Sequence, residues 1–163
     1  MNLVCNAGPA IALAKIDKLA LLPRLYASVS IPETVFHELL AKPGEETDRI
    51  LHAVHSFLKV SPPPASVQPG VTMATRHLDA GEREVIHLAS SFDPSATVLL
   101  DDAAGRRVAT YLEVPVTGFA GILVVAKRRC FVENVVPLVE QARSKGYWLS
   151  DELIETVRNL AEE

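Results

Sequence analysis

The chain has 163 residues, of which 48% are hydrophobic, 22% charged and 6% aromatic. This length is typical of one domain, and the composition is too hydrophobic for a chain that is disordered throughout. Sixteen Lys and Arg against 20 Asp and Glu give a formal net charge of −4, so the whole molecule lacks the positive field that draws in a polyanion from a distance. A nucleic-acid ligand would need a local basic patch.

The cysteines and the apolar N-terminal run both favour a cytoplasmic protein. Cys5 and Cys130 lie far apart between apolar neighbours, so we expect two buried thiols rather than a disulfide or a metal site. The apolar run near the N-terminus covers residues 3–14, whereas a membrane span needs about 20 residues. No positive charge precedes this run, so it is not typical of a signal peptide. We therefore expect no membrane segment.

The N-terminal part alternates strand and helix patterns. Residues 3–5 predict a strand, and the Asn-Ala-Gly-Pro turn after it predicts the start of a helix. Apolar residues every two to three positions extend this helical pattern to residue 25, with breaks near Asp17 and Pro23. Residues 29–31 predict the second strand.

Two helices and a third strand are expected next. Pro32 opens a helix that ends at residues 42–44, and a second amphipathic helix runs toward a short strand at Val60. Residues 61–70 hold four prolines, which favours a surface connection too short to separate two domains. The inward-facing residues of the two helices are expected to be Val35, Leu39 and Leu40, followed by Ile50, Val54, Phe57 and Leu58.

The second half repeats the alternation. Helices are expected at 81–92, 103–112 and 121–130, and strands at 97–100 and 114–117. Two further helices, at 135–145 and 153–160, complete the chain. Strands that alternate with helices favour a parallel sheet covered on both faces. We expect one α/β domain over residues 1–163, closed by the helices within 133–163.

Polar residues follow the first and fourth predicted strands. Asn6 follows the first, and Asp101 and Asp102 follow the fourth. Because ligands of such sheets bind outside the carboxyl ends of the strands, we expect these side chains to share one crevice. Helix capping is an alternative for the acids, and Asp102 can also pair with Arg106 one turn further on. Two adjacent acids exceed what a cap needs, so a functional role stays open beside capping.

Two glutamates are further candidates for this crevice. Asp79 and Glu82 have the three-residue spacing of a capping box, which alone explains both acids. Glu82 also begins the helix that leads into the strand before Asp101, from where its carboxylate can lean over the crevice. Glu38 lies on the helix after the second strand, where a solvated acid is equally ordinary.

Together the acids indicate a site for a hard divalent cation. Mg²⁺ and Mn²⁺ bind oxygen ligands, and Mg²⁺ typically uses one or two carboxylates, several waters and a substrate phosphate. Such an ion activates water and offsets the charge that develops on a phosphodiester. The five histidines lack metalloprotease spacing, and the chain has no glycine-rich phosphate loop.

Five segments spread over nearly the whole chain carry a family resemblance. They are Asn6–Lys15; Ile31–Pro32 with Glu38–Leu39; Leu78–Glu82 with Ala89; Leu100–Asp102 with Gly105–Ala109; and Gly146–Ser150. Their order and spacing resemble the PIN-domain ribonucleases, and within them a toxin-like branch. The resemblance implies a PIN-like three-layer α/β/α sandwich around a parallel sheet of about four to five strands. It also implies an acidic Mg²⁺ or Mn²⁺ site that cleaves RNA.

The resemblance assigns roles to the acids and shows one departure. Glu38, Glu82 and Asp101, with Asp102, match the acidic catalytic and metal-binding positions. Asn6 stands where the family usually has an aspartate, and Gly8 where a Ser or Thr hydroxyl is common. An asparagine keeps a carbonyl ligand but loses a negative charge, so we expect weaker metal binding and reduced or lost catalysis.

RNA also needs cations, and two clusters are candidates. Arg106 and Arg107 follow the acidic pair, and Lys127, Arg128 and Arg129 end a predicted helix. Phosphate contact is one interpretation. The other interpretation is that the first cluster lies on an ordinary solvated face and that the second compensates the helix dipole.

Three functional hypotheses follow. The first is a metal-dependent endoribonuclease of the toxin-like kind, for which the resemblance implies a small antitoxin that covers the site and, in many such proteins, a homodimer. The second is a PIN fold that binds RNA or a protein without cutting it, favoured by Asn6 and Gly8. The third, a receiver-like phosphoryl-transfer protein using Asp101, lacks a partner lysine at a late strand end.

Overall fold

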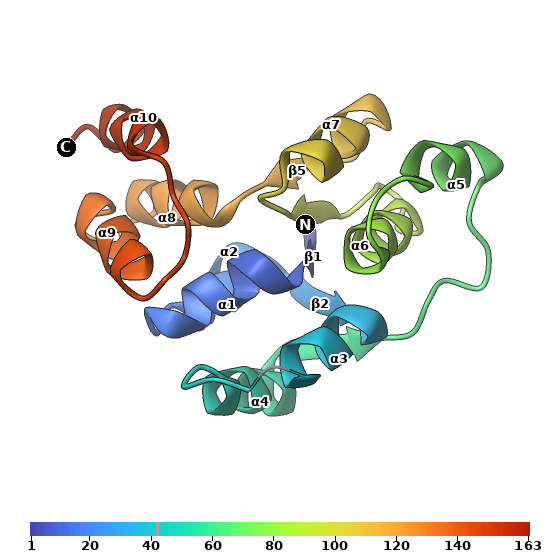
Figure 1. Cartoon of the computed structure of the whole chain (residues 1–163), viewed down its shortest axis with the longest axis horizontal. Helices are drawn as coiled ribbons and strands as arrows, with labels where there is room; N and C mark the ends of the chain where they lie inside the picture. The colour runs from blue at the N-terminus through green and yellow to red at the C-terminus, as the bar shows by residue number, and fades with distance from the viewer. Residues whose placement is uncertain (42) are drawn as a thin grey trace.

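The protein is built around one parallel five-stranded sheet. The computed structural model describes residues 1–41 and 43–163 (Figure 1). The strand order is β3-β2-β1-β4-β5. The strands are β1 (Asn2–Cys5), β2 (Ser28–Pro32), β3 (Leu58–Ser61), β4 (Thr97–Leu99) and β5 (Val116–Thr117). The predicted parallel sheet and its α/β/α class are confirmed.

The strand order reverses at the centre of the sheet. The chain places β2 and β3 on one side of β1 and then crosses over to place β4 and β5 on the other side. The backbone N–H of Asn6 donates to the carbonyl of Leu99 at 3.0 Å, which joins the ends of β1 and β4. A reversal of this kind opens a crevice outside the carboxyl ends of the two strands, where ligands of such sheets bind.

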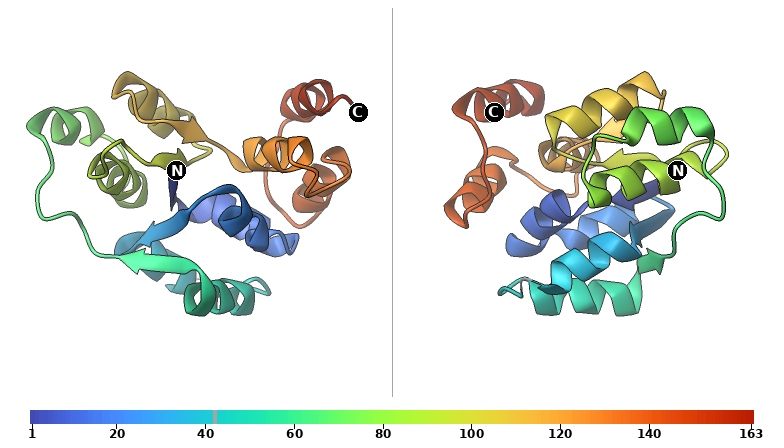
Figure 2. Two further views of the ribbon diagram at one scale, coloured as in Figure 1. Left: turned by 180° about the vertical axis from the view of Figure 1, so that it is seen from behind. Right: turned by 45° about the vertical axis from the view of Figure 1, so that its right-hand side comes forward.

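Helices cover both faces of the sheet (Figure 2). In the first half they are α1 (Ala7–Lys15), the 3₁₀ turn η1 (Leu19–Leu21), α2 (Leu22–Leu25), α3 (Glu33–Ala41), α4 (Thr47–Ser56) and α5 (Pro69–Thr75). The later helices are α6 (Ala80–Ser90), α7 (Ala103–Tyr111), α8 (Phe119–Arg128), α9 (Val136–Ser144) and α10 (Asp151–Ala161). α6 packs against β1, β2 and β4, whereas α1 packs beside α4, α8 and α9.

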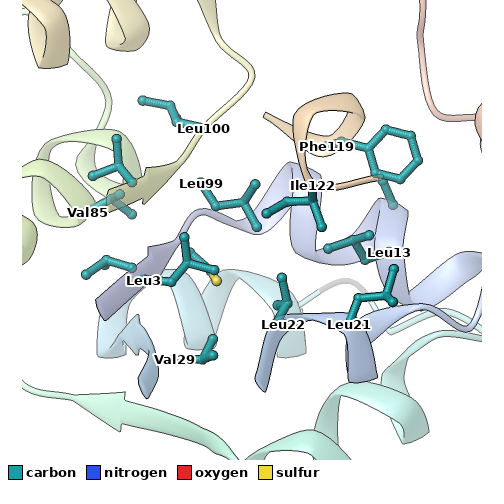
Figure 3. Close-up of a cluster of buried hydrophobic side chains, with 14 of the residues drawn as sticks. Leu3, Leu13, Leu21, Leu22, Val29, Val85, Leu99, Leu100, Phe119 and Ile122 are labelled. Carbon is teal, nitrogen blue, oxygen red and sulfur yellow. The ribbon is translucent and has the colours of Figure 1, made fainter. Parts of the chain in front are cut away.

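The core fixes the strands that carry the candidate site. Leu3 and Leu99, on neighbouring strands, are completely buried, and Phe119 and Ile122 of α8 pack nearby (Figure 3). Burying one such side chain contributes about 1.5–3 kcal/mol. The ends of β1 and β4 are therefore held on a rigid base.

The sequence patterns misplaced several boundaries in the first half. The long helix expected up to residue 25 is divided, because α1 ends at Lys15 and Asp17 takes a left-handed φ of 56°. Leu58 was expected on a helix but begins β3. Leu40 was expected on the inner face of α3 but is 38% exposed, since it lies about 100° around the helix from buried Leu39. The helix end expected at 42–44 begins with Lys42, which lies outside the described residues.

Three further differences concern the later segments. Cys130, expected to be buried, is exposed after the end of α8 with a left-handed φ of 57°; Cys5 is buried as expected. α8 begins at Phe119 rather than at residue 121, because Phe119 is part of the core. The short helix α5 was not expected. Each difference arises from packing that a local pattern does not record.

The last two helices fall where the closing helices were expected. α9 and α10 lie within 133–163 and pack against each other, and α10 also packs against α8 (Figure 1). That residues 1–163 form one domain closed in this way stays a prediction. None of the helices formed by residues 1–41 and 43–163 has the length and apolar character needed to cross a membrane.

Candidate active site

Asn6 and Glu38 point at the same place beside α6. Asn6 begins α1 in an extended conformation, but its side chain makes no capping hydrogen bond. A Cβ atom built on Gly81 would lie 3.4 Å from the Oδ1 of Asn6 and 3.0 and 3.1 Å from the two carboxylate oxygens of Glu38. Three side-chain oxygen atoms therefore lie together beside Gly81, and a larger residue at this position would crowd them.

Glu38 joins none of the ion pairs formed within residues 1–41 and 43–163. Burial raises the pKa of the Glu38 carboxyl above its ordinary value, and the nearby charges of Asp79 and Glu84 raise it further. A cation bound there would reverse this effect, because an opposite charge favours the ionised form.

Glu82 and Asp102 form a second pair of side chains, and both of these are acidic. Asp79 caps α6 by accepting the backbone N–H of Glu82 at 2.8 Å, and this places Glu82 in the first turn with 8% of its surface exposed. Burial raises the pKa of Glu82 to about 7, and the charges of Asp79 and Asp102 add to the shift. A hydrogen bond between the two side chains raises the pKa of Glu82 and lowers that of Asp102, so the protonated Glu82 carboxyl is the donor and Asp102 the acceptor.

Asp102 also caps α7, as the local pattern indicated. Its Oδ1 accepts the backbone N–H groups of Ala104 at 2.7 Å and Gly105 at 2.9 Å. These bonds, led by the one from Gly105, hold the pKa of Asp102 below its ordinary value. The expected pairing of Asp102 with Arg106 is not formed; Arg106 instead donates to the carbonyl of Leu100 at 2.9 Å.

Asp101 is turned toward the start of α8. Its Oδ1 and Oδ2 accept the backbone N–H of Phe119 at 3.0 and 3.3 Å, and the hydroxyl of Tyr147 donates to Oδ2. The pKa of Asp101 is raised, because the loss of water around its carboxylate outweighs the hydrogen bonds from Tyr147 and Phe119 and the charge of Arg106. The neighbouring acid Asp102 faces Glu82 instead.

Tyr147 is a site residue that sequence reasoning missed. Gly146, with φ of 85°, turns the chain after α9, and the Tyr147 ring then packs edge-on against Phe119 with 5.4 Å between ring centroids. Its hydroxyl lies 3.8 Å from the position of a Cβ on Gly8. The turn glycine followed by an aromatic residue, inside a segment of the family resemblance, was the available signal.

The side chains of the site are of the type that binds a hard cation, but they are not arranged around one point. Asn6, Glu38, Glu82 and Asp102 offer only oxygen donors and an excess of negative charge, as Mg²⁺ and Mn²⁺ require. No group of three or more His, Cys, Asp or Glu side chains in residues 1–41 and 43–163 is placed to hold a metal ion. Five side chains were expected to share one crevice. Four of them form two pairs, Asn6 with Glu38 and Glu82 with Asp102, and Asp101 is turned toward α8, so assembly around one ion needs side-chain rotation.

The basic candidates are divided in the same way. Arg106 and Arg128 line a cleft of about 480 Å³ next to Asp101, between α8 and α10. Arg107 and Arg129 are exposed elsewhere on the surface. Lys127 is engaged, since its Nζ lies 2.8 Å from a carboxylate oxygen of Glu163.

Comparison with known families supplies the context for this geometry. The family model DUF3368, described as a PIN domain, matches residues 2–163. A search of curated proteins found no match. The matched region includes every acidic residue of the two pairs and Asp101.

Proposed function

The chain belongs to the PIN-domain family, which has a nuclease fold and typically uses divalent metal ions, and from this premise we propose that it is a metal-dependent endoribonuclease and the toxin of a toxin–antitoxin pair. The observation that supports the proposal best is the convergence of Asn6 Oδ1 and both Glu38 oxygens beside Gly81. An amide oxygen and a carboxylate whose pKa is raised by burial and by neighbouring acids, at the carboxyl edge of a parallel sheet, form the beginning of a metal site.

The residues divide the work of the proposed site. Asn6, Glu38, Glu82 and Asp102 would hold a Mg²⁺ or Mn²⁺ ion through their side-chain oxygens. Asp101, fixed by Phe119 and Tyr147, ties the start of α8 to the edge of the sheet. The bound ion supplies an activated water and offsets charge on the phosphodiester.

Arginines near the acids would hold the RNA. Arg106 and Arg128 lie in the cleft beside Asp101, where guanidinium groups can contact phosphate oxygens. Arg107 and Arg129 are exposed outside this cleft. Lys127 contributes least, because Glu163 already neutralises it.

The same cleft offers a surface for the proposed antitoxin. Its floor and rim include Val125, Leu153 and Leu160, which are 38%, 37% and 52% exposed. Covering these side chains with a small protein removes apolar area from water and blocks access to Asp101. A homodimer is a further proposal for this chain, carried over from the toxin-like branch.

A second candidate function is binding of RNA without cleavage. Two observations favour it. Asn6 lacks the negative charge of the aspartate that the family usually has at the end of the first strand. The carboxylate of Asp101 already accepts a hydrogen bond from Tyr147. Metal-dependent cleavage separates the two functions.

The experiment measures Mn²⁺-dependent cleavage of a single-stranded RNA. We expect slow cleavage by the wild type, none by Glu38→Gln, and wild-type cleavage by Glu33→Gln, a matched control in the first turn of the same helix. Asn6→Asp should be about ten-fold faster, which corresponds to about 1.4 kcal/mol of transition-state stabilisation. Equal, metal-independent cleavage by all four proteins would indicate a contaminant and contradict the proposal. RNA binding without cleavage, even by Asn6→Asp, would favour the second function.

A further inference from the structure

Trp148 has an exposure that the acidic site does not explain. It is the single tryptophan of the chain, and 84% of its surface is exposed. The residue before it, Tyr147, donates a hydrogen bond to Asp101. A large aromatic side chain therefore stands in water one residue from the candidate active site.

The backbone that presents Trp148 is fixed on both sides. The N–H groups of Gly146 and Tyr147 each donate at 3.0 Å, to the carbonyls of Arg143 and Ala142, and Leu149 is buried. Ser150 then caps α10 through the N–H of Leu153 at 3.2 Å. Tyr147 and Leu149 face inward and Trp148 faces outward, so the fixed backbone presents the indole on the surface.

Two lysines lie beside this segment, and they line a pocket together with Glu45, Glu46 and Arg49. Lys145 is exposed, and Lys15 reaches across from α1 to donate from Nζ to the carbonyl of Lys145 at 2.9 Å. Neither ammonium group joins any of the ion pairs formed within residues 1–41 and 43–163. Aromatic rings beside cations are the means by which proteins bind single-stranded nucleic acid, with bases stacked on the rings and phosphates on the cations.

We propose that Trp148 is a stacking platform for an unpaired RNA base, and that Lys15 and Lys145 contact the adjacent phosphates. The inference rests on the proposed function and deepens it, since it makes single-stranded RNA the substrate form of the same site. A protein partner fits less well. An interface hot spot sits inside a packed, desolvated surface, whereas the residues before and after the ring in the sequence, 143–146 and 150–152, are polar or glycine.

Fluorescence provides a direct test, because all tryptophan emission comes from this ring. The probe is a ten-nucleotide oligoadenylate in EDTA, which prevents metal-dependent cleavage during the titration. We expect saturable quenching of the emission. An abasic ribose-phosphate oligomer of equal length keeps the phosphates and removes the bases, and we expect it to leave the emission unchanged.

Variants test the role of the ring by anisotropy of a labelled oligoadenylate. Trp148→Ala and Trp148→Leu should bind about ten-fold more weakly, and Trp148→Phe within about three-fold of the wild type, since stacking needs an aromatic face. Met73→Ala, which removes a 69% exposed apolar side chain on α5, is the control and should bind as the wild type does. Equal melting temperatures of the variants show that each one is folded.

Unchanged affinity of Trp148→Ala, or equal quenching by the abasic oligomer, would overturn the inference. A third outcome would also overturn the inference: tryptophan emission that changes with protein concentration without RNA, together with self-association that Trp148→Ala abolishes. That outcome would indicate that Trp148 lies in an interface between copies of this chain. The two proposals fail separately. Mn²⁺-dependent cleavage with the same KM in Trp148→Ala contradicts stacking alone, whereas base-dependent quenching without any cleavage contradicts the nuclease and supports stacking.

Discussion

Gly118 shows how one missing side chain orients an acid of the site. A Cβ atom at this position would lie 2.2 Å from the Oδ1 of Asp101 and 3.2 Å from the guanidinium of Arg106. Only a glycine therefore lets Asp101 approach the N–H of Phe119. The direction of Asp101 thus depends on a residue 17 positions later in the chain.

We predict that Gly118→Ala displaces Asp101 and destabilises the protein by about 1–3 kcal/mol, the range for overpacking a close contact. Denaturant unfolding measures the loss. Gly8→Ala is the matched control, because its Cβ would meet nothing closer than the Tyr147 hydroxyl at 3.8 Å. Equal stability of Gly118→Ala and the wild type would show that Asp101 does not need this contact.

Local rules predicted some site residues and could not predict others. The end of a strand located Asn6, and capping patterns correctly placed Asp79 and Asp102. Tyr147 lies 46 residues from the Asp101 that it contacts, so no local spacing reveals the pair. The rotation of Asp101 away from the other acids is a tertiary effect for the same reason.

α9 depends at its start on a carboxylate from beyond α10. The two oxygens of Glu163 accept the N–H groups of Val135 at 2.6 Å and Val136 at 2.9 Å, and one also pairs with Lys127. These bonds, first the one with Lys127, hold the pKa of Glu163 below its ordinary value. One side chain therefore joins α8, α9 and α10.

We expect Glu163→Ala to cost about 1–3 kcal/mol, since it leaves backbone donors and a lysine without their acceptor. Glu162→Ala removes an exposed carboxylate at the preceding position and should change the stability little. Thermal unfolding of the two variants makes the comparison. A smaller loss in Glu163→Ala than in Glu162→Ala would be inconsistent with this role.

α5 and α6 are joined by a bond that should be sensitive to pH. The Nε2 of His87 lies 2.8 Å from the hydroxyl of Thr75, and burial, followed by the charge of Arg83, lowers the pKa of His87. The unfolded chain therefore binds a proton more readily, so this histidine makes stability fall as pH drops below its ordinary pKa of 6.5.

His87→Gln should flatten that part of the profile. Unfolding free energies of both proteins between pH 5 and 8 provide the measurement, and the difference between the two curves removes the contributions of other groups. Parallel curves would mean that His87 titrates alike in the folded and unfolded states.

The periodicity of apolar residues predicted well which segments are helices or strands, but it predicted their first and last residues poorly. The strand–helix alternation gave the parallel sheet, because a buried parallel strand reads as a short apolar run. It extended one helix past Asp17 and assigned Leu58 to a helix, since a short run at a helix–strand junction fits both periods.

The strand order of the sheet brings the polar residues of the candidate site to one edge. Asn6 and Asp101 are 95 residues apart in number, yet both follow strands that pair directly in the sheet. The edge could be predicted from sequence because parallel strands end together. The division into two acidic pairs could not, since it depends on the packing of α3, α6 and α7 around that edge.

The central claim is that this edge binds a divalent metal ion, and calorimetric titration of the metal-free protein with Mn²⁺ tests it most directly. We predict binding by the wild type, about ten-fold weaker binding by Glu38→Gln, tighter binding by Asn6→Asp, and no change in Glu33→Gln, because affinity for a hard cation follows the charge of its oxygen ligands. Absence of binding, or the same Kd in all four proteins, would contradict the account.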